Sequence, residues 1–176
     1  MDLRVKKTLI NIKKAFFDIK KRKPLDKISV KELSEKAMIN KATFYLHYKD
    51  IYDLSEKVEK DLIDEMMTEI KKCKLQKNRE SYHKMIETVN KTVLSYYDQI
   101  IVVFTDNKNS RFVEHFQNSI MEYICTEIPE FRNNDEIKLM ISYMLYGTYH
   151  ILSKSDYNKE RLIKLSSKFA LVLTNI

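Results

Sequence analysis

The side chains best suited to binding chemistry are concentrated in one short stretch, residues 40–49. Asn40 and Lys41 carry hydrogen-bond donors that match the acceptor atoms on the edges of nucleic-acid bases. Ala42 is small enough to let the backbone approach the methyl group of a thymine. Hydroxyl and imidazole groups suited to phosphate oxygens follow at Thr43, Tyr45 and His47. The stretch therefore indicates a surface that meets both bases and phosphates.

Two short helices joined by a tight turn are predicted to position these side chains. Ser29, with Glu32 three residues later, forms a capping box that starts a helix over residues 30–36. After a short break, Asn40 caps a second helix over residues 41–48. The flanking helices are predicted over residues 3–21 and 51–74. Such a helix-turn-helix places its second helix in the major groove of DNA, where the first residues of that helix reach base edges.

The remainder of the chain is also predicted to be helical. One glycine and two prolines among 176 residues are too few for the frequent turns of an all-β fold. Further helices are predicted over about 82–96, 97–104, 110–128, Asn134 or Asp135 to 153, and Asp156 or Asn158 to 174. We therefore expect an all-α protein of about nine helices. Its predicted domains are residues 1–50, a three-helix DNA-binding domain, and residues 51–176, a helical bundle.

The positive charge of the chain is confined to its first third. Residues 1–60 contain 16 Lys and Arg against 9 Asp and Glu, a balance of +7. Residues 61–176 contain 16 of each kind and are neutral. A basic domain beside a neutral one predicts that the first domain binds a polyanion and that the second has a different role.

The run from Ile28 to Tyr48 resembles the DNA-binding domain of TetR (AcrR-type) transcriptional regulators. Its most specific part is Thr43-Phe44-Tyr45-Leu46-His47-Tyr48, and the resemblance covers about residues 4–60. It implies a homodimer in which each copy reads half of a near-palindromic operator in double-stranded DNA. The DNA contacts that it implies are Ser29, Asn40, Lys41, Ala42, Thr43, Tyr45 and His47.

Two positions depart from the pattern of that family. Where the family usually has glycine in the turn, this chain has Met38, and a non-glycine residue in the left-handed region costs about 1–2 kcal/mol. Where the family commonly places a phosphate-contacting lysine at the start of the next helix, this chain has Ile51. We expect Lys49 to supply that contact instead.

Residues 51–176 are predicted to bind an effector and to hold the dimer together. The predicted dimer seam lies on the last two helices, at Met140, Met144, Gly147, Ile151, Leu162, Leu165, Phe169 and Val172. A glycine inside a helix costs about 1 kcal/mol relative to alanine. At Gly147 this favours the close approach of another helix, and a ligand slot is the alternative.

The effector is expected to be a small apolar or amphipathic molecule. A cavity in a helical bundle is mostly apolar with a few polar groups, which methionine and aromatic side chains suit. The candidate contacts are Tyr96, Phe104, Phe112, Phe116 and Met121. Side chains of these types at helical spacing more often form a plain core.

The composition excludes several other classes of protein. One glycine builds neither a phosphate-binding loop nor a nucleophile elbow, and the histidines lack metal-ligand spacing. We therefore expect no enzyme activity, no cofactor and no metal. Cys73 and Cys125 lack C-x-x-C spacing and no secretory signal pattern precedes them, so we expect reduced thiols in a cytoplasmic protein. No run is apolar enough to span a membrane.

Two other functions compete with DNA binding. The chain is alternatively a helical adaptor whose C-terminal domain binds a protein partner. Its basic amphipathic first helix is also compatible with an anionic membrane surface. The capped run from Asn40 to Tyr48 favours the DNA-binding function over both. We therefore predict a sequence-specific transcriptional regulator, a repressor that its effector releases from the operator.

Overall fold

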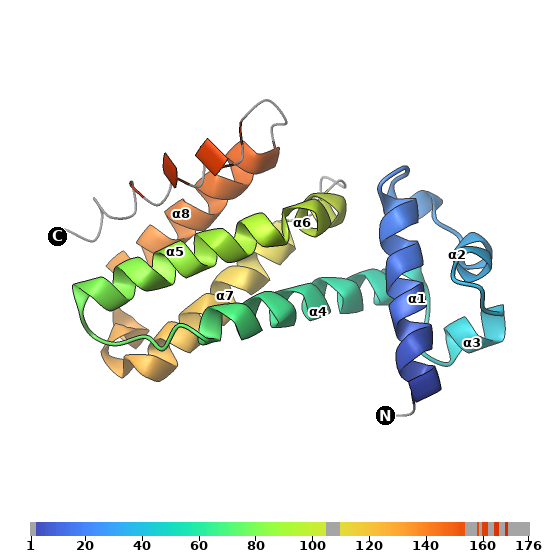
Figure 1. The fold of residues 1–176 in the computed structure, drawn as a ribbon, viewed down its shortest axis with the longest axis horizontal. Coiled ribbons are helices and arrows are strands. Elements are labelled where there is room, and N and C mark those ends of the chain that lie inside the picture. Colours follow the sequence, from blue (N-terminus) through green and yellow to red (C-terminus); the bar gives the residue numbers. More distant parts are fainter. Residues whose placement is uncertain are drawn as a thin grey trace. The chain divides into compact units, whose positions relative to one another are not determined.

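Helices make up all the regular secondary structure that the computed structural model describes, over residues 3–104, 110–153, 158, 160–161, 164–165 and 168 (Figure 1). The α-helices in these ranges are α1 (Leu3–Lys20), α2 (Val30–Lys36), α3 (Lys41–Tyr45), α4 (Ile51–Lys71), α5 (Arg79–Ser95), α6 (Tyr97–Phe104), α7 (Ser110–Glu127) and α8 (Asp135–Ser153). Two 3-10 turns, η1 (Leu25–Lys27) and η2 (Pro129–Asn133), join them. The all-α prediction is confirmed.

The chain divides into two compact units, and the division falls inside α4, after Leu62. The first unit, the head, holds the described residues up to Leu62 together with Gln99–Phe104. The second unit, the body, holds Ile63–Asp98 and the described residues from Ser110 onward. The sequence had placed the domain boundary earlier, at the start of α4.

The head is built on one hydrophobic core. Its buried members come from α1, α2, α3, the first turns of α4 and the connections between these helices: Ile12, Ala15, Phe16, Ile19, Ile28, Leu33, Ala37, Phe44, Tyr48, Ile51, Leu54 and Val58. On α1 and α4 these residues recur every three or four positions, so each helix buries a single face. Because the start of α4 contributes three residues to this core, it belongs to the head.

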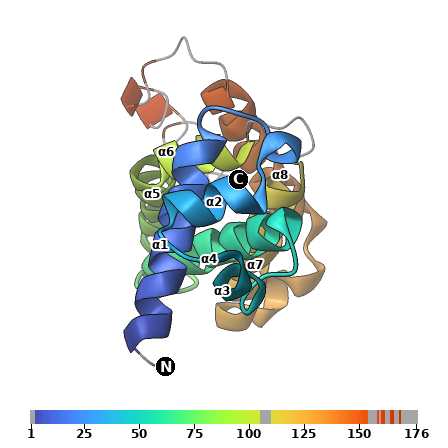
Figure 2. The ribbon, with the colours of Figure 1, turned by 90° about the vertical axis from the view of Figure 1, so that its right-hand side faces the viewer.

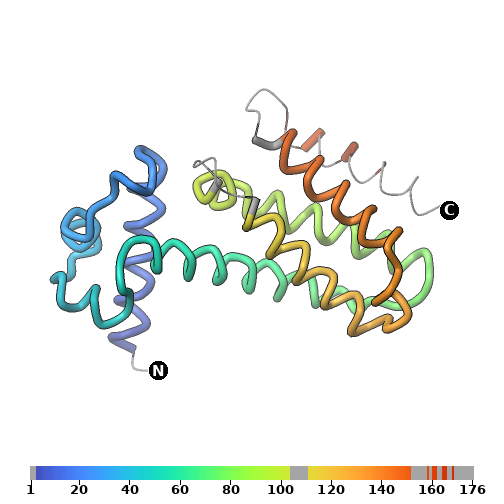
Figure 3. The backbone as a smooth tube through the Cα atoms, turned by 180° about the vertical axis from the view of Figure 1, so that it is seen from behind, coloured from blue at the N-terminus to red at the C-terminus, as the bar shows by residue number. Residues whose placement is uncertain are grey.

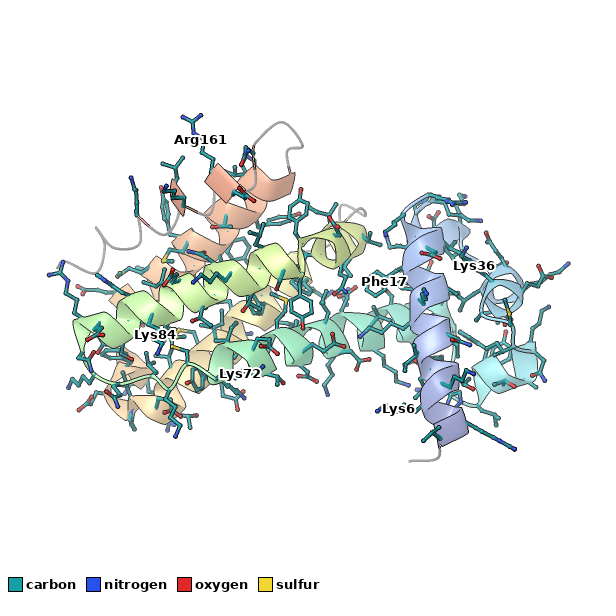
Figure 4. All side chains as sticks on the ribbon, viewed as in Figure 1. Lys6, Phe17, Lys36, Lys72, Lys84 and Arg161 are labelled. Carbon is teal, nitrogen blue, oxygen red and sulfur yellow. The ribbon has the colours of Figure 1, made fainter. Side chains whose placement is uncertain are left out.

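Ion pairs on the rim of this core link the helices of the head. Lys36 of α2, labelled in Figure 4, lies 3.6 Å from Asp18 of α1, and Lys23 lies 2.6 Å from Glu32 of α2. These side chains are partly exposed, so each pair contributes at most about 1 kcal/mol. Burial of the apolar faces therefore provides most of the stability of the head, and the ion pairs orient the helices.

In the body, α7 contacts parts of the chain that are distant from it in sequence. Figure 3 shows α7 and α8 side by side, joined through η2. The hydroxyl group of Tyr123 on α7 donates to the carbonyl oxygen of Cys73 at 2.7 Å and accepts the N–H of Leu75 at 3.3 Å. Burial raises the pKa of Tyr123 above its ordinary value, so the phenol remains a donor at neutral pH. One side chain thereby attaches the α4–α5 connection to α7.

Most of the predicted helices are present with small differences at their ends. α2 has the predicted bounds, and α6 and α8 match the predicted short helix and the helix ending at residue 153. α3 ends at Tyr45 rather than at residue 48, because the N–H groups of His47 and Tyr48 both bond to the carbonyl of Phe44 and tighten the turn. Most of the last predicted helix, from Asp156 or Asn158 to about 174, lies outside the described residues.

We expect Tyr123→Phe to destabilise the protein by about 1–3 kcal/mol, because it leaves a buried carbonyl and a buried N–H without their partner. Urea denaturation followed by circular dichroism measures this change. Tyr82→Phe is the matched control, since Tyr82 is a half-buried phenol of the same unit whose ring packs on Phe131. Equal effects of the two substitutions would contradict the proposed attachment.

Candidate nucleic-acid interface

The turn between α2 and α3 has the backbone pattern that normally requires glycine. Met38 has a φ of 56°, in the left-handed region. Its N–H donates to the carbonyl of Glu35 at 3.2 Å, and the N–H of Ile39 donates to the carbonyl of Ser34 at 3.0 Å. These two bonds form a Schellman motif, which ends the helix and aims the chain into α3. The Met38 side chain is 91% exposed, so little packing compensates for the strain.

Asn40 caps α3 through two hydrogen bonds to one residue. Its Oδ1 accepts the backbone N–H of Thr43 at 2.7 Å and the hydroxyl of Thr43 at 2.9 Å. Asn40 is exposed, and its amide nitrogen carries two donors. The hydroxyl proton of Thr43 is held within the cap, so this group is an acceptor toward an outside partner.

Two aromatic rings hold α3 against the rest of the head. Phe44 is fully buried, and its ring centroid lies 5.5 Å from that of Tyr48, four residues later. Burial, with nearby Asp61 and Asp53, raises the pKa of the Tyr48 phenol. A five-residue helix has little stability of its own, so these contacts determine how α3 is placed.

The predicted DNA contacts lie at the start of α2, along α3 and in the turn after α3 (Figure 2). The exposed ones are Ser29, Asn40, Lys41, Ala42, Tyr45 and Lys49, and the half-buried ones are Thr43 and His47. The Ser29 hydroxyl accepts the N–H of Glu32 at 3.2 Å, as the capping box predicted. Lys41 forms no ion pair within the described part of the chain, so its ammonium group is open to an outside anion.

Lys57 of α4 contacts the turn that follows α3. Its Nζ donates to the carbonyl oxygen of His47 at 3.0 Å, lies 3.3 Å from the Asp53 carboxylate and sits 5.1 Å from the centre of the Tyr48 ring. Asp53 also accepts the backbone N–H of Lys49 at 2.8 Å. That backbone bond, together with Lys57, lowers the pKa of Asp53. The carboxylate is therefore ionised at neutral pH and holds Lys57 in place.

The first turn of α4 is not open to a phosphate in the way that the family pattern implies. Ile51 is buried in the core of the head, and Asp50 caps the helix by accepting the N–H of Asp53 at 2.9 Å. Lys49 is exposed beside this turn, where it can reach outward. The Lys49 side chain is thus exposed at the position where the sequence predicts a phosphate contact.

Two contributors to this surface were absent from the sequence predictions. Leu46 is 80% exposed although it is a large apolar residue. Its N–H bonds to the carbonyl of Ala42, which places both residues on the same face of α3. Leu46 follows Ala42 by four positions, and this helical spacing could have indicated that the two residues share a face. For Lys57 only the spacing of four from Asp53 was visible, and that does not reveal its bond to His47.

The body contains an apolar cavity of about 320 Å³. Side chains of α5, α7, η2 and α8 line it, among them Tyr82, Met85, Phe131, Met140 and Met144. Met140 and Met144 were predicted for the dimer seam instead. None of the predicted pocket residues that the structure describes lines this cavity. Phe112 and Phe116 are buried in the core, and Tyr96 is half-buried. Met121 lines a separate polar hollow, and the Phe104 side chain lies outside the described residues.

The predicted seam is only partly within the described residues. Leu162, Phe169 and Val172 lie outside them. Ile151 and Leu165 are exposed, and no described side chain lies within 4 Å of a methyl group built on Gly147. The outer side of α8 also exposes Leu139 and Tyr143. Large apolar side chains of α8 are therefore exposed near the predicted seam, whereas the predicted seam residues Met140 and Met144 line the cavity.

Other kinds of site find no support in the described ranges. None of the helices there is both long and apolar enough to cross a membrane. No cluster of three or more His, Cys, Asp or Glu side chains among the described residues is arranged to hold a metal ion.

Comparison with known proteins identifies the architecture. No family model and no curated protein matches the sequence. A TetR-like transcriptional regulator from Rhodococcus sp. RHA1 superposes with a TM-score of 0.64 at 16% identity, over 97% of this chain and 94% of that one. The dihydroxyacetone kinase operon activator DhaS superposes with a TM-score of 0.58 at 15% identity, over 96% and 92%. The fold is TetR-like.

The TetR-like fold extends over almost the whole chain, whereas the sequence resemblance covered only about residues 4–60. The head contains the helix-turn-helix and the body contains the helical bundle, as the resemblance implied. At 15–16% identity the similarity establishes architecture. The roles of individual residues rest on the geometry described above.

We expect Met38→Gly to stabilise the TetR-like head by about 1 kcal/mol. Glycine removes the left-handed strain of about 1–2 kcal/mol and loses part of that gain to the greater freedom of the unfolded chain. Thermal and urea unfolding measure the change. Met38→Ala serves as the control, because it shortens the side chain but keeps the Cβ atom that causes the strain. If alanine stabilised the protein as much as glycine, strain would not be the cause.

Proposed function

We propose that this protein is a DNA-binding transcriptional regulator whose α3 reads bases in the major groove. The observation that carries the proposal is the exposed, capped start of α3, with Asn40, Lys41 and Ala42 facing solvent on a basic head. Residues at the leading end of such a helix are those that reach base edges. A TetR-like fold supports the same role.

The side chains divide into base-reading and phosphate-binding groups under this proposal. Lys41 and the free amide of Asn40 donate to base acceptors. Ser29, Tyr45, His47 and Lys49 contact phosphates at the sides of the groove, where they set the register. Thr43 maintains the cap of α3 and accepts a hydrogen bond at most.

The operator is proposed to be a near-palindrome bound by a homodimer. The side chains of Leu139, Tyr143 and Tyr146 support this, because they are exposed at helical spacing on one side of α8 and together form an apolar patch of the kind found at contact surfaces. Two heads held by such a seam would bind half-sites about 34–36 Å apart. Repression remains the predicted direction of regulation. The neighbour DhaS is named an activator, so a reporter gene placed behind the operator decides between the two.

The effector is proposed to bind in the cavity of the body. Its volume of about 320 Å³ lies at the lower end of the range for small-molecule sites, and its lining is mostly apolar. Glu136 is the one carboxylate among the described lining residues, and no described lysine or arginine accompanies it. The cavity therefore favours a compact apolar effector that is neutral or cationic.

Sequencing the DNA that the purified protein retains from its own genome tests the proposed function. We expect enrichment of a near-palindromic site, protected in footprints at two half-sites. Lys41→Ala should relax sequence preference at one position of each half-site. Retention of no specific DNA, with binding to a protein partner instead, would favour the adaptor alternative.

We expect two lysines near the end of α3 to affect DNA binding differently. Lys49→Met should reduce the slope of log K against log salt concentration by about 0.9, the value for one lost phosphate contact. Lys57→Met should weaken binding about tenfold without changing that slope, since its ammonium group already bonds to His47 and Asp53 and acts by positioning α3. Fluorescence anisotropy at several salt concentrations measures both.

Lys57→Arg provides the control for positioning, because it retains the charge and a donor. Partial recovery of affinity in this variant is expected. A reduced salt slope in Lys57→Met would instead make Lys57 a phosphate ligand and contradict its assignment as a positioning residue.

We expect the charge of the effector to influence its affinity for the cavity. At concentrations below micelle formation, decyltrimethylammonium and decanol should raise the melting temperature more than decanoate, by binding about two- to fivefold tighter. Differential scanning fluorimetry gives the comparison. Glu136→Gln should reduce the difference between cation and anion, and a preference for decanoate in the unaltered protein would contradict the proposed effector class.

A further inference from the structure

The centre of the outward face of α3 is apolar. Phe44 is fully buried, so the residues two positions before and after it along the helix face the opposite way. These are Ala42 and Leu46, and the Leu46 N–H bonds to the Ala42 carbonyl at 3.1 Å. Leu46 continues the helical conformation of α3 and is 80% exposed. The two side chains therefore form one short apolar stripe on the surface that faces the groove.

Neither side chain of this stripe carries a hydrogen-bond donor, and the exposed phenol of Tyr45 adjoins Leu46 in the sequence. The hydroxyl of Thr43 donates to Asn40 at 2.9 Å and is held by the cap. Lys41 lies toward the leading end of α3, on one side of the stripe. The middle of the reading surface can therefore distinguish bases mainly by apolar contact rather than by hydrogen bonds.

The charges around the stripe suit duplex DNA. Lys41 and Lys49 are exposed on either side of it along the chain, and residues 1–60 carry a balance of +7. A duplex presents phosphates along the edges of its major groove and base edges on the floor. On that floor the C5-methyl group of thymine is the one apolar group that belongs to a standard base.

We propose that Ala42 and Leu46 recognise thymine methyl groups in each operator half-site, with Leu46 as a specificity-determining residue. This inference rests on the proposed DNA-binding function and adds to it the chemical feature that the operator must present. Leu46 contacts the methyl group of one thymine, or of two neighbouring ones, and Ala42 allows the backbone of α3 to approach closely enough for that contact.

Replacing single thymines by deoxyuridine in the retained operator tests the proposal. Deoxyuridine keeps the base pair and the charge and removes only the methyl group. For the unaltered protein, the affinity should fall about fourfold at one or two positions of each half-site, as expected for one buried methyl-sized group. For Leu46→Ala, deoxyuridine at those positions should have almost no further effect.

Matched controls keep the outcomes distinct. Leu46 is exposed, so Leu46→Ala should remain folded by circular dichroism, and Ile10→Ala removes an exposed apolar side chain from α1 without changing the response to deoxyuridine. Operator binding that is insensitive to deoxyuridine at every position overturns the inference and leaves the proposed function intact. The inference is also overturned, with the proposed function intact, if Leu46→Ala responds to deoxyuridine as strongly as the unaltered protein does. A change in self-association alone has the same meaning. Failure to bind any operator overturns the proposed function itself.

Discussion

The burial of Phe44 is the constraint on which the geometry of the head depends. α3 is too short to be stable alone, so the contact of this ring with the core determines where the helix lies. With Phe44 facing inward, the periodicity of the helix turns Ala42 and Leu46 outward. Lys57 then holds the other end of the same short helix through the His47 carbonyl. A core ring and one ammonium group together decide which side chains are presented to a partner.

Features set by neighbouring residues were predictable, and features set by distant contacts were not. The caps at Ser29 and Asn40 act within one helical turn, so the sequence predicted the start of both helices correctly. The end of α3 was misjudged because Phe44 and Tyr48 are spaced as in a helix, yet a tighter turn brings them to the same core. The division after Leu62 likewise depends on which core α4 contacts, and its apolar stripe continues unchanged through both units.

The body illustrates the same limit. Met140 and Met144 line the cavity, while Phe112 and Phe116, considered for a pocket, fill the core. Apolar residues at helical spacing look alike in sequence whether they meet another helix, a ligand or a second copy of the chain. The position of the cavity depends on how η2 and α8 pack against α7, which the spacing of apolar residues does not reveal. The hydrogen bonds of the Tyr123 hydroxyl were equally unpredictable, because its partners lie about fifty positions away in the sequence.

The left-handed methionine in the turn bears on how this protein can change over generations. Proteins tolerate mutation until their stability falls below a threshold, so a single available stabilising substitution widens the set of tolerated changes. Met38 is such a position, because glycine there would remove strain and little packing. Descendants that acquired it would have stability in reserve for less favourable residues on the outward face of α3. Divergence toward new target sequences would then proceed with less risk of unfolding.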